Sequence, residues 1–167
     1  MRIPVIYLKD KQAFSRKAGF LRMIGKPLDL ARELKSAGYE LIHIVDQDAI
    51  SGLTKNLDVY DGLTYIINVQ VECAPDEKLV HKLLTLKCRV VLPPSFVTSA
   101  LSEKRLLVAK IPKDYAGDAE GFHDVVLEDA TESEIRRFVA LGKRVIIYDK
   151  DEKEVKEEVW GIITSSF

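Results

Sequence analysis

The chain contains eight short runs of apolar, mostly β-branched residues, each bounded by glycine, proline or charged residues. Runs this continuous are typical of strands that are buried on both faces of a parallel sheet. The pattern therefore predicts an α/β protein with eight strands. The runs cover residues 3–8, 40–45, 64–71, 88–93, 105–111, 124–128, 144–149 and 160–164.

Helical periodicity separates several of these runs, and its start and stop signals are those of ordinary helices. Pro27 stands at a first helical position, and Gly38 follows the last turn of the same segment. Thr131 and Glu134 have the spacing of a capping box. The expected helices span residues 26–37, 75–87 and 131–141.

The alternation of strands and helices favours one domain, residues 1–167, folded as a compact TIM-like (βα)8 barrel. A chain of 167 residues is much shorter than the ~250 of a common barrel, so several helices must be short or missing. An open doubly wound sheet is the alternative, because it shows the same alternation.

Composition narrows the function classes. A net charge of −1 and a pI near 6.3 argue against a general binder of nucleic acids or membrane surfaces. No apolar run approaches the ~20 residues of a membrane helix, and no signal peptide is evident, so we expect a cytoplasmic protein. Few amides and many Lys and Glu residues suit a thermophile. Cys73 and Cys88 lack metal-ligand spacing, so we expect reduced core thiols, no metal and no cofactor.

One stretch carries a family resemblance. Residues 39–56 read YELIHIVDQDAISGLTKN, preceded by GKPLDLARELKSAG at 25–38 and, more loosely, by IPVIYL at 3–8. Together they resemble the first two strands and the second loop of the ribotide isomerases of histidine biosynthesis (ProFAR isomerases). The resemblance implies a TIM barrel descended from an aldose–ketose isomerase.

The resemblance also implies two catalytic aspartates, at the ends of barrel strands 1 and 5. Moving a proton between adjacent carbons needs two groups of suitable pKa on opposite sides of the substrate. In this chain Tyr7 stands at the first position, and Lys110 or Ile111 at the second. Four other carboxylates could replace the aspartates or could simply be loop residues: Asp10, Asp46, Asp114 and Asp149.

The phosphate sites that the resemblance implies are altered as well. Glycine-rich ends of strands 3 and 7 let backbone N–H groups approach a phosphate closely. Here these ends carry Glu72 and Asp149, whose charges would repel a phosphate. The polar residues at the ends of strands 4 and 8 remain candidate ligand contacts: Ser95, Thr164 and Ser165.

The end of strand 2 is closest to the family pattern. His43, Asp46, Asp48 and Asn56 stand where the family has the same or similar residues. They predict a ligand-contact loop. In the alternative, the two aspartates cap the loop through Asx-turns and His43 fills the barrel interior.

Charge is distributed unevenly. Residues 9–26 contain six Lys or Arg and one acid, and we expect a loop here that overhangs the barrel mouth. Arg16 and Lys17 are candidates for binding an anion or an acidic partner, although the segment could also be a solvated loop. Residues 149–158 are acidic, as a solvated helix face often is. Residues 112–123 could form a lid or mark a lost helix.

Two hypotheses follow. In the first, the chain is a non-catalytic binding or assembly protein that takes a small anionic or phosphorylated ligand, or forms a homo-oligomer. In the second, it is a sugar-phosphate isomerase or lyase with Tyr7, Asp46 and Lys110 as a rebuilt acid/base set. Lys110 could then form a Schiff base.

Overall fold

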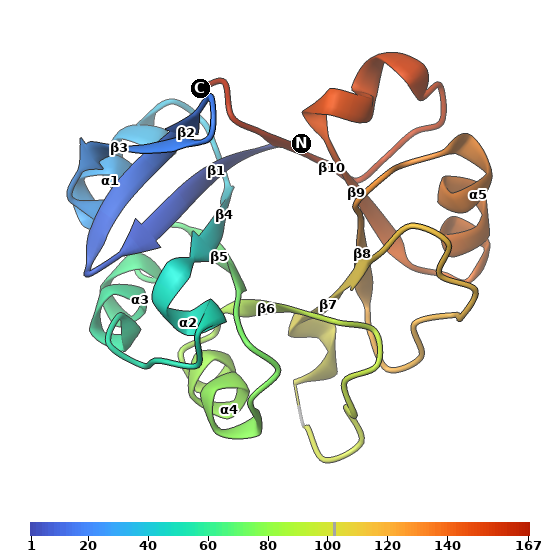
Figure 1. Cartoon of the computed structure of the whole chain (residues 1–167), viewed down its shortest axis with the longest axis horizontal. Coiled ribbons are helices and arrows are strands. Elements are labelled where there is room, and N and C mark those ends of the chain that lie inside the picture. The colour runs from blue at the N-terminus through green and yellow to red at the C-terminus, as the bar shows by residue number, and fades with distance from the viewer. Residues whose placement is uncertain (102) are drawn as a thin grey trace.

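The computed structural model describes residues 1–101 and 103–167 and shows a closed barrel of eight parallel strands (Figure 1). Strand β10 pairs with β1, with Arg2 opposite Ile162, and this contact closes the sheet. The predicted barrel is confirmed, and the open sheet is wrong. The strands are β1 (Arg2–Lys9), β4 (Leu41–Asp46), β5 (Asn68–Glu72), β6 (Arg89–Leu92), β7 (Leu107–Ile111), β8 (Asp124–Leu127), β9 (Arg144–Tyr148) and β10 (Gly161–Thr164).

Helices cover the outside of the barrel unevenly. The three expected helices are confirmed as α1 (Pro27–Ser36), α4 (Glu77–Thr85) and α5 (Glu132–Ala140). Two more, α2 (Gln47–Ile50) and α3 (Leu57–Leu63), lie between β4 and β5. Among the described residues, the β6–β7 crossover contains only the 3-10 turn η1 (Lys104–Leu106), and the β9–β10 crossover only the 3-10 turn η2 (Asp149–Glu154). Residues 112–123, which connect β7 and β8, contain no helix. Short and missing helices explain how a chain of 167 residues can form a barrel.

The basic segment after β1 is not the loop that its charge suggested. It forms a hairpin of β2 (Gln12–Lys17) and β3 (Phe20–Gly25). Tyr7 of β1 pairs with Phe14, so β2 runs back along β1, away from the carboxyl end of the barrel. The expectation of a loop over the mouth is therefore wrong. Charged residues interrupt the period-two apolar pattern here, and that pattern is the signal by which a strand is recognised.

Alternation along the strands separates two apolar layers. One strand side chain in two packs outward against the helices, as Ile44 and Val71 do in the larger cluster, to which Phe138 of α5 also belongs. The smaller cluster fills the barrel interior and consists of Ile3, Leu41, Val91, Val108, Val126, Ile146 and Ile163. Cys73 and Cys88 are buried free thiols, as expected, and burial raises the pKa of each to about 12.

Barrel closure gives a first testable prediction. A Cβ atom on Gly161 would lie 2.6 Å from Cδ1 of Ile3, which is fully buried in the interior. Replacing Gly161 by Val should therefore lower the free energy of unfolding by about 1–3 kcal/mol through overpacking. Urea denaturation measures it, with Ile162→Val on the same strand as the control. Equal stability of the Gly161→Val variant and the parent would contradict the described closure.

Candidate functional site at the barrel mouth

A series of hydrogen-bonded polar side chains runs through the barrel interior. At the end of the barrel where the parallel strands begin, the series starts with an ion cluster. Asp124 is fully buried and accepts hydrogen bonds from Arg144 Nε at 2.7 Å and Nη2 at 2.8 Å. Arg89 Nη2 lies 2.5 Å from Asp124 Oδ2 as an ion pair, and Trp160 lies against both guanidinium groups. Burial alone would raise the pKa of Asp124, but the two arginines outweigh it and lower the pKa below its usual value.

The middle of this series fixes which ring nitrogen of the buried His43 carries its proton. Arg89 Nε donates to Oε1 of Gln70 at 3.1 Å, so the amide nitrogen of Gln70 faces His43 Nδ1 at 2.9 Å and must donate to it. The proton of His43 therefore sits on Nε2, which donates to Oε1 of Glu72 at 3.2 Å. This relay carries a fixed hydrogen-bond direction from the ion cluster to the mouth.

Glu72 ends the relay at the carboxyl end of the barrel. Its Oε1 also lies 3.1 Å from Lys110 Nζ and 3.5 Å from the hydroxyl of Tyr148. Burial would raise the pKa of Glu72, but the interactions with His43 and, after them, the charge of Lys110 lower it to about 2. Burial raises the pKa of Tyr148, so its phenol stays protonated at neutral pH.

Two adjoining cavities open around this group. One, of about 410 Å³, is lined by Glu72, Lys110 and Glu128 together with apolar residues that include Leu92 and Pro93. The other, of about 300 Å³, is lined by Lys110, Glu128, Tyr148, Asp149 and Lys150. Lys110 and Glu128 belong to both, and their charged groups lie 3.9 Å apart. The mouth can therefore offer a small polar ligand carboxylates, ammonium groups and a phenol.

Of the proposed acid/base set, only Lys110 lines these cavities. Tyr7 is on the inner side of β1, with the guanidinium of Arg16 5.8 Å from its ring centre. Asp46 is buried and bonds to residues 48–60, so no hydrogen bond or ion pair among the described residues joins it to Lys110 or Tyr7. The structure does not bring the three residues together.

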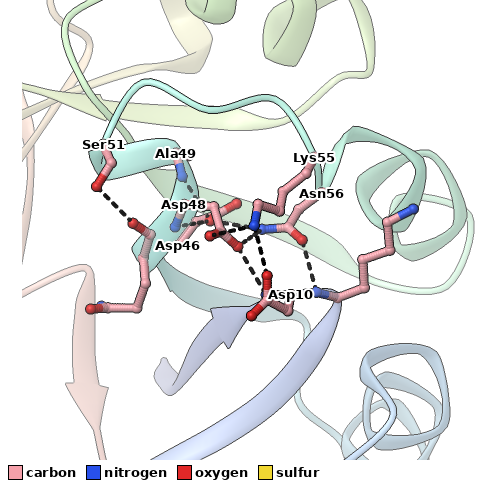
Figure 2. Close-up of polar contacts among 9 residues, drawn as sticks. Asp10, Asp46, Asp48, Ala49, Ser51, Lys55 and Asn56 are labelled. Atoms are coloured by element: carbon pink, nitrogen blue, oxygen red, sulfur yellow. Dashed lines mark hydrogen bonds and ion pairs between the residues drawn. The ribbon is translucent and has the colours of Figure 1, made fainter.

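The family-like loop after β4 forms a cluster centred on Asp46 (Figure 2). Asp46 Oδ1 accepts from the backbone N–H groups of Asp48 and Ala49, both at 2.9 Å, and so caps α2. Asp46 Oδ2 accepts a hydrogen bond from the hydroxyl of Tyr60 at 2.6 Å, and Asn56 Nδ2 donates a further hydrogen bond to Oδ1 at 2.9 Å. These contacts of Asp46 are those expected from the alternative in which the aspartates cap the loop. A ligand role for the loop stays a prediction.

The same loop also holds the turn that starts the hairpin. Asp10 and Lys11 both have positive φ, 46° and 64°, which costs energy for residues other than glycine. Asp48 Oδ2 accepts from Asp10 N–H and Asn56 Oδ1 from Lys11 N–H, each at 2.9 Å. Lys55 bridges Asp10 at 2.7 Å and Asp48 at 3.5 Å. The motif thus fixes the β1–β2 turn, which leads into the β2–β3 hairpin, as Figure 2 shows.

The remaining predicted residues are dispersed. His43 is fully buried inside the barrel, and Arg16 and Lys17 are exposed on β2. Ser95 is exposed after β6. At the end of β10, Thr164 Oγ1 accepts from Ser166 N–H at 3.2 Å, and the backbone N–H of Ser165 donates to Asp149 Oδ2 at 3.2 Å.

Sequence reasoning missed most of the relay. Glu72 was noted only for its charge, while Gln70, Arg89, Glu128 and Tyr148 were not singled out. The available signal was a polar residue at every second position of strands predicted to be buried on both faces, as in Gln70 and Glu72. Within residues 1–101 and 103–167, no group of three or more potential ligands could hold a metal ion. In the same residues, no helix has the length and apolarity needed to span a bilayer.

Comparison with known proteins gives several relatives that carry the name of one isomerase, and one uncharacterized protein. The chain is 30% identical over 120 residues to the 1-(5-phosphoribosyl)-5-((5-phosphoribosylamino)methylideneamino)imidazole-4-carboxamide isomerase of Nitrosopumilus maritimus, covering 68% of this chain and 49% of the isomerase. It is 32% identical over 74 residues to the isomerase of that name in Methanocaldococcus jannaschii, covering 42% and 31%. An uncharacterized protein of the latter organism is 28% identical over 121 residues, covering 65% and 52%.

The extent of these matches limits what they show. The chain spans about half the length, or less, of these curated relatives. No protein-family model matches it. The matches agree with the fold in identifying the ancestry, while the activity has to be argued from the site.

The lowered pKa of Glu72 gives a second prediction. A carboxyl whose pKa falls from 4.5 to about 2 on folding stabilises the protein above pH 4.5, and this contribution is lost as the pH falls towards 2. At ~1.4 kcal/mol per pH unit the loss is about 3 kcal/mol. Urea denaturation between pH 5 and pH 2 should therefore show a shallower loss of stability for Glu72→Gln than for the parent.

The more exposed Glu128 provides the control for that experiment, since it also faces Lys110 but from the rim of the mouth. Glu128→Gln should follow the parent curve. Parallel curves for Glu72→Gln and the parent would show that Glu72 does not have the lowered pKa.

Proposed function

We propose that this diverged relative of the ProFAR isomerases binds a small ligand at the carboxyl end of its barrel and does not isomerise the ribotide. The observation that carries the proposal is the ion pair between Lys110 and Glu72, 3.1 Å apart. It lies at the ends of β7 and β5, where Lys110 lines both cavities of the mouth and Glu72 lines one of them. These strand ends are where the family resemblance would require one catalytic aspartate and one phosphate site.

The acid/base chemistry of the isomerases lacks matching groups here. Tyr7 and Lys110 occupy the strand ends at which the resemblance implies aspartates. Glu72, a carboxylate inside the mouth, already accepts hydrogen bonds from His43 and Lys110. Its low pKa makes it a weak base. Tyr148 has a raised pKa and is equally unsuited to take up a proton.

A substrate with a phosphate at each end would also meet opposing charges. Glu72, Glu128 and Asp149 all line the cavities. Asp149 also uses up a backbone hydrogen-bond donor, because its carboxylate accepts a hydrogen bond from Ser165 N–H at the end of β10. A backbone N–H at a strand end is the kind of group that holds a phosphate, so a carboxylate of the chain itself takes the place of an external anion.

The ligand we propose is therefore small and carries one anionic group. Lys110 and Lys150 provide positive charge, although each is also paired with a carboxylate. Glu128 and the hydroxyl of Tyr148 would accept and donate hydrogen bonds to ligand hydroxyls. Cavities of about 410 and 300 Å³ are at the lower end of the size that ligand sites have.

One observation favours a second function, a lyase or isomerase acting on a sugar monophosphate. Lys110 and Tyr148 converge on the same oxygen of Glu72, so an amine, a phenol and a carboxylate share one cavity mouth. An amine in such a site could form a Schiff base with a carbonyl substrate. Borohydride reduction in the presence of sugar phosphates, followed by mass spectrometry, would detect the covalent adduct on Lys110.

The absence of ribotide isomerisation is the third prediction. Losing a general acid or base costs ~10²–10⁴ in rate, and weaker phosphate binding should lower the rate further. The purified chain should show no turnover above background under conditions in which the N. maritimus isomerase is active. Turnover at a typical enzyme rate would refute the proposal.

Binding of a single anion is the fourth prediction. Calorimetric titration with a panel of sugar monophosphates should give a saturable signal, and Lys110→Gln should weaken the affinity at least tenfold. Binding should also weaken at higher salt, because exposed charges are screened over ~10 Å at 0.1 M. Arg16→Ala with Lys17→Ala tests whether the hairpin contributes to the attraction.

The exposed Lys35 is the matched control, because it lies in the last turn of α1, at the amino-terminal end of the barrel, so Lys35→Gln removes one positive charge away from the mouth. It should leave the affinity unchanged. A flat response to the whole panel would exclude an anion site at the mouth. Equal losses in Lys35→Gln and Lys110→Gln would show only non-specific attraction.

A further inference from the structure

Strand β3 is an open edge on an otherwise closed sheet. The eight barrel strands are paired on both sides, whereas β3 pairs only with β2 among the described strands. None of its residues is buried: Phe20 is 78% exposed and Met23 58%, while Leu21 and Ile24 are each more than a third exposed. Figure 1 shows the hairpin projecting outside the barrel beside α1.

An exposed apolar edge strand has a specific physical consequence. Its free N–H and C=O groups form a template for another strand, and proteins usually protect such edges with charges, proline or a covering element. In β3 only Arg22 has this role, and the other five residues are Phe, Leu, Met, Ile and Gly. A contiguous apolar patch of this kind marks an interaction surface.

We propose that β3 of one copy pairs antiparallel with β3 of a second copy, across a two-fold axis at Met23. A second copy presents the same edge, so the two sets of free backbone groups match each other directly. The pairing would cover Met23 and its neighbours and extend one sheet through both hairpins.

The choice of register follows from the side chains. A two-fold axis perpendicular to the ribbon must pass through a single residue. At Arg22 it would place two guanidinium groups directly opposite each other, which is unfavourable. At Leu21 it would pair the strand with Ala18 and Gly19, whose positive φ values of 48° and 81° belong to a turn. A central Met23 avoids both problems.

With Met23 at the centre, five residues of each strand overlap. Leu21 then lies opposite Gly25, and Arg22 lies opposite Ile24 with its alkyl stem available for packing. Phe20 comes opposite Lys26, an arrangement that allows a cation–π contact. The most exposed aromatic residue of the hairpin would therefore have a cationic partner in the second copy.

The basic side chains of the two hairpins would also be brought together. Residues 9–26 carry six cations and one acid in each copy, so the dimer should be opposed by charge repulsion at low salt. Screening should strengthen it as the salt concentration rises. Anion binding at the mouth has the opposite salt dependence, which keeps the two proposals separable.

Sedimentation velocity at increasing protein concentration tests the dimer. The parent chain should associate, and more so at higher salt, whereas Met23→Lys should remain monomeric with an unchanged circular dichroism spectrum. The control is Val139→Lys on α5, whose parent residue is 52% exposed, close to the value for Met23. It should associate as the parent does. A monomeric parent at every concentration, or a Met23→Lys variant that still dimerises, would overturn the proposal.

Disulfide trapping tests the register independently. Opposed residues in an antiparallel pair have Cα atoms ~4.5–5.5 Å apart, within the range that a disulfide bridges. Met23→Cys should form a covalent dimer on mild oxidation, well ahead of Arg22→Cys and Val139→Cys. Cys73 and Cys88 are buried and should not compete. Cross-linking of Met23→Cys no faster than Val139→Cys would contradict pairing at Met23.

Discussion

The buried relay through the barrel is the constraint on which the rest of the structure depends. A charge in the barrel interior is stable only when a partner compensates its lost hydration. Asp124 needs Arg144 and Arg89, and Nε of Arg89 fixes the orientation of Gln70. Gln70 sets the tautomer of His43, which in turn holds Glu72 ionised. Removing one member would leave its neighbour buried without a hydrogen-bond partner. The interior polar residues therefore depend on one another for their stability.

This constraint reaches the mouth, where function would be expected. Glu72 has to remain a carboxylate to satisfy His43 inside the barrel, and it therefore places a permanent negative charge in the cavities. Lys110 neutralises that charge at 3.1 Å. The site cannot be described as an isomerase site with two substitutions, since its polarity is set by what lies beneath it. Ligands that tolerate a fixed anion and a paired ammonium are the ones it can accept.

The fold was largely predictable from the sequence, because buried parallel strands and capped helices leave local signals. The eight strands were found within a few residues, except that β5 begins at Asn68 rather than at residue 64. Residues 64–67 instead finish the turn after α3, as the hydrogen bond from Ile67 N–H to the carbonyl of Leu63 shows. The hairpin was missed because Asp10 and Lys11 adopt left-handed geometry without glycine, held by Asp48 and Asn56 from a distant loop. No local pattern encodes a turn that is stabilised by residues 38 and 45 positions away.

The candidate site was harder to predict for a related reason. Asp46, Asp48 and Asn56 retain the family pattern, and their observed contacts are with backbone and side chains of the chain itself. These contacts give the residues a structural role of their own, because losing them would release both a helix cap and the turn that leads into the hairpin. The family-like residues of this loop thus lie where they hold parts of the barrel together. The groups that would decide activity, at the ends of β5 and β7, are those in which this chain departs from the pattern.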